Sequence, residues 1–279
     1  MDYTSKKKLT TFFVYFCLIF IVIISIFPVF WMILTSIKPT SETLSGLESL
    51  VVHNPTLGNY SAVNKIAPML YPTMNSIFVT FFGTVSTLFF CSLAGFAFAK
   101  FRFPGRDALF LMVLVTLLIP QEVGIVPLFT IMRSLHLTNS LWSLIIPRAA
   151  TALGIFYMRQ YCMSVPDEIV EAARIDGCRD FTIYTRVILP IIKPALASWA
   201  SLTMISRWND FFWPLIFMRT PKKYTLMVTI SLLPVSDGLS TPWPVIMAGT
   251  SIAVLPIIIL YFLFQKFQKA DLMAGAVKG

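Results

Sequence analysis

The chain has 279 residues, of which 57% are hydrophobic and only 13% are charged, and its formal net charge at pH 7 is +9. A soluble domain carries about 25% charged residues, so this composition excludes an ordinary water-soluble protein. The basic residues lie mostly between long apolar runs and show no aromatic–basic recognition pattern, which favours orientation in a membrane over nucleic-acid binding.

The first apolar run covers residues 11–37 and follows three lysines, Lys6 to Lys8. A signal peptide begins in a similar way, but its apolar core is only about 7–15 residues long and a cleavage site follows it. This run is longer and lacks such a site. It therefore predicts an uncleaved first span with a kink at Pro28.

Five further runs are long enough to cross a bilayer, which takes about 20 apolar residues. The third span is interrupted by Pro120, Gly124 and Pro127. The sequence thus predicts an all-α membrane protein with six transmembrane helices in a single domain of residues 1–279. Spans two to six are expected at residues 72–99, 108–132, 141–161, 190–218 and 243–264, with a tail at 265–279.

Lysine and arginine counts predict the orientation of these spans. With six spans, the amino terminus, the loops at 100–106 and 159–193, and the tail share one side, which holds fourteen of the 22 basic residues. The opposite side holds seven, and Arg207 falls inside the fifth span. This excess places both termini in the cytoplasm. The polar stretch 38–71 is then an external loop.

The stretch 164–190 carries eight charged residues and cannot be a span, because each charge at the bilayer centre costs about 2.5–3.5 kcal/mol. Its local signals are nevertheless helical. Ser164 with Asp167 is typical of a capping box, Gly177 of a helix end, and Asp180 of the cap of a second short helix. We therefore expect a cytoplasmic helix–turn–helix that returns to the membrane at Pro190.

The first helix of this loop has an apolar face of mostly small residues: Ile169, Ala172, Ala173 and Ile175. One interpretation is an amphipathic helix lying on lipid headgroups, which would favour lysine-rich polar faces and bulky anchors. This helix is acidic at its start and rich in alanine. A protein partner is the preferred interpretation.

The same loop resembles the EAA loop of permease subunits of bacterial ABC importers. The family pattern is an acid and two alanines, a glycine four residues after the second alanine, and a later Leu-Pro pair. Here these are Glu171-Ala172-Ala173, Gly177 and Leu189-Pro190, and Val187 stands where isoleucine is commoner in the family.

Further motifs resemble the carbohydrate-importer branch of that family, and in particular permeases related to the smaller membrane subunit of maltose transporters. They are Asn75-Ser76, the stretch 101–106, Trp208-Asn209-Asp210 and the terminal stretch 275–279. The resemblance implies the type I importer fold, with residues 72–264 as the core permease region. It also implies a second homologous permease, two ATP-binding subunits and an external solute-binding protein as partners.

By this resemblance the chain is a transport subunit and not an enzyme. It has no Gly-x-x-x-x-Gly-Lys-Ser/Thr phosphate loop, so ATP and Mg²⁺ would bind to the partner subunits, and no cofactor is expected on this chain. The four cysteines, Cys17, Cys91, Cys162 and Cys178, have no metal spacing and form no plausible disulfide, so no metal is expected. The implied ATPase-coupling residues are Glu171, Ala172, Ala173, Asp176, Gly177, Leu189 and Pro190.

Polar residues inside spans are candidates for the solute pathway, because burying them in a membrane is costly. The third span offers Gln121 and Glu122, and the fifth offers Trp208, Asn209 and Asp210 beside Arg207. One interpretation is that these residues contact or gate a sugar. The other is an aromatic belt at the membrane interface with Trp208 and Trp213 as anchors, while Arg207 and Asp210 pair internally. In the maltose system the partner permease is expected to make most sugar contacts.

Two regions carry open alternatives. The tail resembles family tails that dock between the ATPase subunits through Gly275, Val277, Lys278 and Gly279, whereas a disordered end is the alternative. The loop 219–242 either touches the binding protein or is a plain external connector.

Competing functions are import of another polar solute, such as glycerol phosphate, by the same machinery, and a self-sufficient secondary transporter. Secondary transporters commonly show paired internal repeats with a broken helix in each half, and this chain shows one broken span and no matching half. A membrane enzyme would need a cluster of catalytic groups, whereas His53 and His136 are isolated in the sequence.

Overall fold

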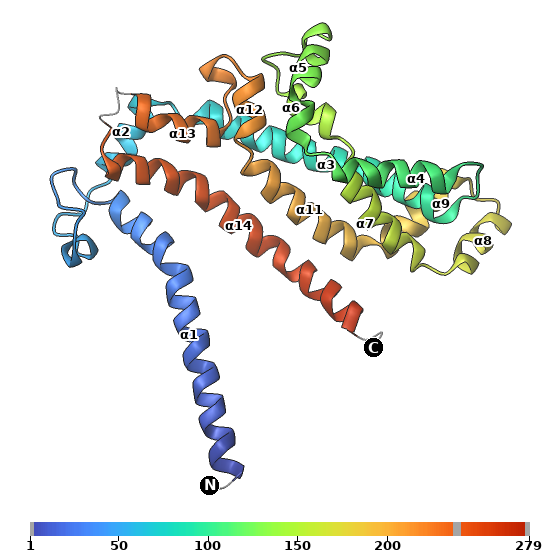
Figure 1. Ribbon diagram of the computed structural model, residues 1–279, viewed down its shortest axis with the longest axis horizontal. Coiled ribbons are helices and arrows are strands. Elements are labelled where there is room, and N and C mark those ends of the chain that lie inside the picture. The colour runs from blue at the N-terminus through green and yellow to red at the C-terminus, as the bar shows by residue number, and fades with distance from the viewer. Residues whose placement is uncertain (1–2, 237–240, 277–279) are drawn as a thin grey trace. The chain divides into compact units, whose positions relative to one another are not determined.

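The computed structural model describes residues 3–236 and 241–276, which form helices and connecting segments with no β-strand (Figure 1). The α-helices are α1 (Tyr3–Ser36), α2 (Gly58–Ile66), α3 (Leu70–Lys100), α4 (Arg106–Val115), α5 (Ile125–Ser134), α6 (Trp142–Ile145), α7 (Ala152–Met163), α8 (Asp167–Ile175), α9 (Asp180–Ile183), α10 (Leu189–Ile191), α11 (Lys193–Trp208), α12 (Phe212–Phe217), α13 (Leu226–Ser236) and α14 (Trp243–Ala276). Short 3₁₀ turns are η1 (Leu47–Leu50), η2 (Thr116–Leu118), η3 (Gln121–Gly124), η4 (Ile146–Arg148) and η6 (Pro221–Lys223), and η5 (Tyr184–Ile188) is a π-helix.

Contacts divide the chain into two compact units. The first comprises residues 1–68 and 230–255, and the second comprises residues 69–229 and 256–279. In the first unit the side chain of Asn59 donates to the carbonyl oxygens of Ser36 and Lys38, which ties α2 to the end of α1. The residues discussed as functional candidates below lie in the second unit.

Three helical segments among the described residues are long and apolar enough to cross a membrane: Thr11–Ser36, Leu70–Lys100 and Trp243–Leu263. The number rises to five if each of two bent helix pairs is one span. The chain therefore has several membrane-spanning segments, while six spans and the side on which each terminus lies stay predictions. The first segment is continuous through Pro28.

The interruption predicted in the third apolar run is present. Arg106–Leu118 and Gln121–Ser134 meet at 95° across Ile119 and Pro120. Proline lacks the amide hydrogen that an uninterrupted helix would use, so the break falls where the sequence indicates it.

The span expected at 141–161 is not one continuous helix. The backbone leaves the helix after Arg148, and Thr151 is extended with its side chain accepting a hydrogen bond from the Gly154 amide, so α7 starts afresh. The fifth apolar run is also divided, because α11 ends at Trp208 and α12 begins at Phe212.

The carboxy-terminal half differs from expectation in two places. The connector expected at 219–242 contains the apolar helix α13, which lies at Leu226–Ser236. The last helix does not stop near Phe264 but continues to Ala276, so residues 265–276 are helical. Of the tail candidates, Gly275 lies in α14, whereas Val277, Lys278 and Gly279 lie outside the described residues.

Helices α7 and α11 pack along α3 in the second unit (Figure 1). Glycines permit the close approach of α3 and α7. A Cβ on Gly95 would lie 2.7 Å from the backbone nitrogen of Arg159, and one on Gly154 would lie 2.7 Å from the sulfur of Cys91. Small residues at such crossings are typical of helices that associate within membranes.

The two ends of α3 contact different parts of the chain. Near its start, the amide of Asn75 donates to the carbonyl oxygens of Lys222 and Tyr224. At its end, Lys100 contacts the segment that leads into α8. A helix of 31 residues is about 46 Å long, so these two regions lie at opposite ends of a membrane-length helix.

Candidate functional site

Helix α8 presents two faces of different character. Val170 and Ala173 are buried in the core cluster formed with α3 and α7, whereas Glu171 and Ala172 are exposed. The apolar face expected from sequence is thus divided, because Ala173 points inward while Ile169, Ala172 and Ile175 point outward. Val170, missing from the expected face, supplies the main inward anchor. The helix is therefore held from one side and open on the other.

The turn after α8 requires glycine. Gly177 has φ +77°, a left-handed conformation that side chains strain. Its amide donates to the Arg174 carbonyl, and the Cys178 amide donates to the Ala173 carbonyl. These two bonds form a Schellman motif and satisfy carbonyls that the helix end would leave free. The helix end predicted at Gly177 is confirmed.

The two predicted amino-terminal caps are wrong. The hydroxyl of Ser164 donates to the Tyr161 carbonyl and so closes α7, while Pro166 precedes α8 without a side-chain cap. Asp180 is the first residue of α9 and makes no capping hydrogen bond, although its carboxylate lies 3.5 Å from Arg174. Local residue types thus indicated where α8 and α9 begin, but not which hydrogen bonds are made at their amino-terminal ends.

A buried lysine fixes the start of α8. The ammonium of Lys100, whose side chain is 3% exposed, lies 2.5 Å from the Asp167 carboxylate and also donates to the Val165 carbonyl. The hydrogen bond and charge of Lys100 lower the pKa of Asp167 below its usual value. Sequence analysis missed this pair because the partners are 67 residues apart.

The segment after Gly177 returns along the same core. Ile183, Tyr184 and Ile188 are buried, and the Tyr184 hydroxyl lies 2.7 Å from the Ser92 hydroxyl on α3. Leu189 and Pro190 begin α10, after which the chain bends by 80° into α11. Both arms of the loop therefore join the same helix, α3.

The outer surface of this loop is apolar as well as charged. The side chains of Ile175 and Phe181 are 86% and 59% exposed. A groove of about 340 Å³ lies beside α8, with Glu171 and Arg174 among its lining residues. Exposed apolar side chains beside charged ones are typical of a surface that binds another protein.

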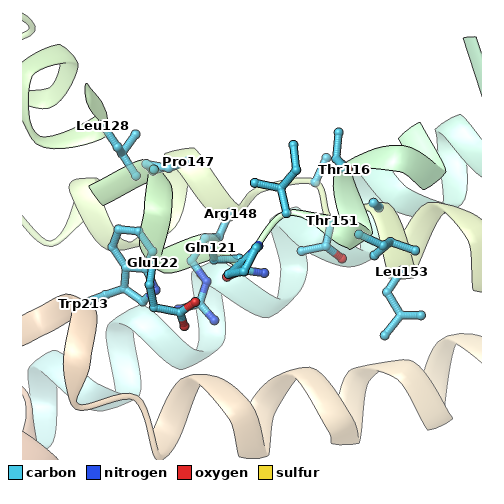
Figure 2. Close-up of a pocket in the computed structure, with 15 residues that line it drawn as sticks. Thr116, Gln121, Glu122, Leu128, Pro147, Arg148, Thr151, Leu153 and Trp213 are labelled. Carbon is cyan, nitrogen blue, oxygen red and sulfur yellow. The ribbon is translucent and has the colours of Figure 1, made fainter. Parts of the chain in front are cut away.

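A second region surrounds the break between α4 and α5. A pocket of about 660 Å³ is lined there by Gln121 and Glu122 of η3, Arg148 of η4 and Trp213 of α12, together with apolar residues and Thr151 (Figure 2). Its volume falls in the range of about 300–1,000 Å³ usual for small-molecule sites.

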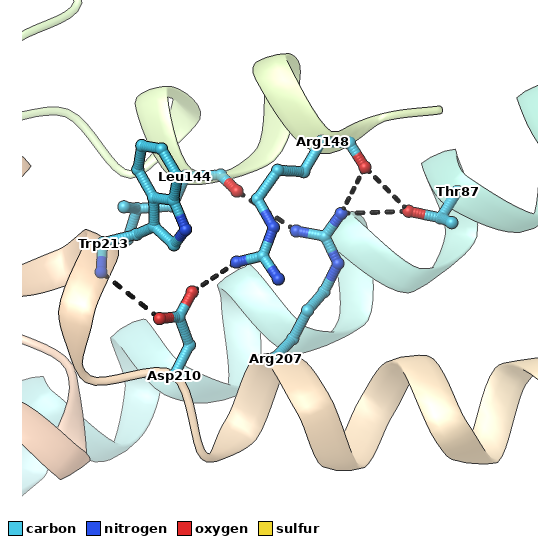
Figure 3. A network of polar contacts seen from close by, with 6 residues as sticks. All are labelled: Thr87, Leu144, Arg148, Arg207, Asp210 and Trp213. Carbon is cyan, nitrogen blue, oxygen red and sulfur yellow. Dashed lines mark hydrogen bonds and ion pairs between the residues drawn. The ribbon is translucent and has the colours of Figure 1, made fainter. Parts of the chain in front are cut away.

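Arg207 ties together the elements behind this pocket (Figure 3). Its guanidinium donates to the carbonyl oxygens of Leu144 and Arg148 and to the hydroxyl of Thr87. Gly83 on α3 leaves room for it, because a Cβ there would lie 2.6 Å from the guanidinium nitrogen. An arginine that is only 5% exposed thus joins α3, α6, η4 and α11.

Arg148 is held at its side chain as well as at its carbonyl. Its guanidinium forms an ion pair with the Asp210 carboxylate, which also accepts a hydrogen bond from the Trp213 amide (Figure 3). The expected internal pairing of Asp210 with Arg207 is therefore wrong, since Arg148 is the partner. Arg148 lies within residues 141–161, which were expected to be a span. A cation inside a span indicates a functional site, so the sequence alone could have identified Arg148 as a candidate.

The sequence-predicted pathway residues do not form one group. Gln121 and Glu122 line the pocket, and Asp210 supports it through Arg148. Trp208 is buried at 3% exposure, whereas Asn209 is exposed; neither lines the pocket. Trp213, expected only as an interface anchor, lines the pocket and stacks on Phe217 with ring centroids 5.9 Å apart. Within the described residues no group of three or more metal-ligating side chains occurs.

Comparison with known proteins gives the family. Residues 91–272 match the family of binding-protein-dependent transport system inner membrane components. The chain belongs to this family and is a membrane permease of an ABC transport system that depends on a binding protein.

Similar proteins include the arabinooligosaccharides transport system permease protein AraQ of Bacillus subtilis, 34% identical over 98% of this chain and 96% of that protein. The lactose transport system permease protein LacG of Rhizobium radiobacter is 28% identical over 99% of each chain. A crystal structure of a bacterial ABC transporter that imports the acidic polysaccharide alginate contains a chain 28% identical to this one. It matches with a TM-score of 0.84 over 95% of this chain and 99% of that chain.

Proposed function

We propose that this chain passes a carbohydrate from an external solute-binding protein into the cytoplasm. Its relatives support this substrate class, because AraQ and LacG carry the names of sugar transport systems. A second, homologous permease would pair with this chain, and the two chains together would form the pathway for the solute. The hydrolysis of ATP, with Mg²⁺, belongs to two partner subunits.

The observation that carries the coupling proposal is the two-sided character of α8. Val170, Ala173 and the Lys100–Asp167 pair hold the helix to the membrane helices, while Glu171 and Ala172 face outward. A helix fixed on one side transmits a rigid-body movement of an ATPase docked on the other side. Asp176 and Gly177 end the helix, and Leu189 and Pro190 begin the short helix before α11, so the movement would reach that helix.

We also place both termini and α8 in the cytoplasm. The excess of lysine and arginine on that side supports this orientation. The opposite end of α3, with the segment around Lys222, would face the binding protein. Six spans result if the three long apolar helical segments are each one span, each of the two bent pairs is one span, and α6 and α7 together form the sixth. Docking of the tail between the ATPase subunits stays part of the same proposal.

The test uses Glu171→Lys and Gly177→Asp in the complete transporter reconstituted in liposomes. We expect binding-protein-stimulated ATP hydrolysis and uptake to fall by about tenfold or more, while basal ATP hydrolysis by the partners continues. Glu48→Lys is the matched control, because Glu48 is an exposed carboxylate outside the loop. Normal stimulated hydrolysis and uptake in both loop variants would contradict the coupling role.

A further inference from the structure

The pocket beside the α4–α5 break contains polar groups that the protein itself does not use. Glu122 makes no ion pair or hydrogen bond through its carboxylate with any residue that the structure describes, and the same holds for the side-chain amide of Gln121. Of the guanidinium nitrogens of Arg148, only Nη1 has a partner within the described ranges. Acceptors and donors therefore converge on the pocket together with the indole of Trp213 (Figure 2).

The positions of Arg148 and Trp213 are fixed from behind. Asp210 holds both, through the Arg148 guanidinium and the Trp213 amide, and Arg207 holds the Arg148 carbonyl. Pre-organised polar groups bind a ligand better because fewer side chains must be ordered on binding.

The charged groups in and behind the pocket leave its lining with one unpaired charge, which would favour some solutes over others. Asp210 neutralises Arg148, and Arg207 is turned toward the carbonyl oxygens of Leu144 and Arg148 (Figure 3). Glu122 is the charged lining residue left unpaired, and its charge is negative. An anionic solute would meet repulsion from Glu122 and would find Arg148 already neutralised.

We infer that this pocket is a solute subsite of the permease itself and that it takes an uncharged polyhydroxylated molecule, rejecting sugar acids and phosphorylated solutes. Hydroxyl groups would donate to Glu122 and accept from the free N–H groups of Arg148. The flat indole of Trp213 offers an apolar face to a sugar ring. Asp210 and Arg207 act as positioning residues. This inference rests on the proposed function and narrows its substrate class.

The test measures binding to the complete transporter in lipid nanodiscs without the binding protein, so that the specificity of that protein does not enter. Saturation-transfer NMR would be recorded with lactose and an arabino-oligosaccharide as neutral probes, and with an alginate oligosaccharide as the anionic probe. We expect saturation to be transferred from the transporter to a neutral probe, and little to be transferred to the anionic probe. Glu122→Gln should weaken neutral binding about tenfold, the effect of losing one hydrogen bond to a charged group.

Further variants of Glu122 separate the effect of its charge on binding from the effect of its side-chain shape. Glu122→Asp should keep the exclusion of the anionic probe, Glu122→Lys should abolish it, and Glu48→Gln should change neither. Assembly and basal ATP hydrolysis of each variant show whether it is folded. Equal transfer to both probes in the wild type overturns the charge selection, and an unchanged signal in folded Glu122→Gln overturns the pocket. A wild-type transporter that shows no binding-protein-stimulated uptake of any sugar would instead contradict the proposed function.

Discussion

At the scale of single residues, the arrangement around Arg207 shows how a charge is accommodated among membrane helices. Two carbonyl oxygens and one hydroxyl accept from its guanidinium, and no carboxylate within the described ranges pairs with it. Hydrogen bonds to a charged group contribute about 1.5–3 kcal/mol each, more than bonds between neutral groups. Gly83 supplies the space, so the two residues depend on each other.

Gly83→Ala should therefore destabilise the protein by about 1–3 kcal/mol, because the added Cβ displaces the guanidinium from its acceptors. Thermal unfolding of the purified transporter in detergent measures this loss. Gly124→Ala is the control, since nothing lies within 4 Å of the Cβ added there. Equal melting temperatures for the Gly83 variant and the wild type would show that the guanidinium moves without cost.

At the scale of helices, α8 is held at its start by a contact between residues far apart in the sequence and at its end by local hydrogen bonds. The Lys100–Asp167 pair fixes its start, and the Schellman bonds around Gly177 fix its end. Helices of nine residues are not stable alone in water, so these contacts and the burial of Val170 and Ala173 maintain it. A stable α8 is a condition for its proposed role in coupling.

Lys100→Met should loosen this helix and speed the hydrogen exchange of α8 amides several-fold, because Asp167 and the Val165 carbonyl lose their partner. Exchange followed by mass spectrometry measures the effect. Lys65→Met, which removes an exposed lysine on α2, is the control. Unchanged exchange in α8 would assign its stability to the apolar contacts alone.

The same pair sets a pH dependence. The folded-state pKa of Asp167 is lowered, so its contribution to stability is present above the ordinary aspartate value of about 4 and disappears as pH falls through the lowered pKa. Exchange of α8 in the wild type, corrected for intrinsic rates, should thus be constant from roughly pH 5 to 8. A rise within that window would contradict the assignment of the ion pair.

At the scale of the whole molecule, orientation in the membrane decides which partner meets which surface. The proposed topology places the segment 177–180 inside the cell and the segment 221–223 outside. Arg179 and Lys222 are both exposed side chains, so either position is accessible to a reagent on its own side.

Arg179→Cys and Lys222→Cys, each in a variant lacking the four native cysteines, test this topology. A membrane-impermeant maleimide should label position 222 in intact cells and position 179 only after permeabilisation. Labelling of both positions from outside, or the reverse order, would contradict the proposed orientation and with it the cytoplasmic location of α8.

Sequence by itself determined the class of molecule, the helix–glycine–helix loop at 164–190 and the break near Pro120. These features rest on composition, on the φ of +77° that glycine adopts at 177, and on the missing amide hydrogen of proline. Such effects act within one turn of the chain, so local residue types reveal them.

Only the tertiary structure decided which charged groups meet. Asp210 pairs with Arg148, 62 residues away, and Asp167 with Lys100, 67 residues away, whereas one interpretation of the sequence pairs Asp210 with Arg207. In the fourth apolar run a new helix begins where the Thr151 side chain caps it. In the fifth run, the Asp210 carboxylate between α11 and α12 accepts a hydrogen bond from the Trp213 amide. Hydropathy measures how apolar a segment is, but the partner of a buried charge depends on how the helices pack.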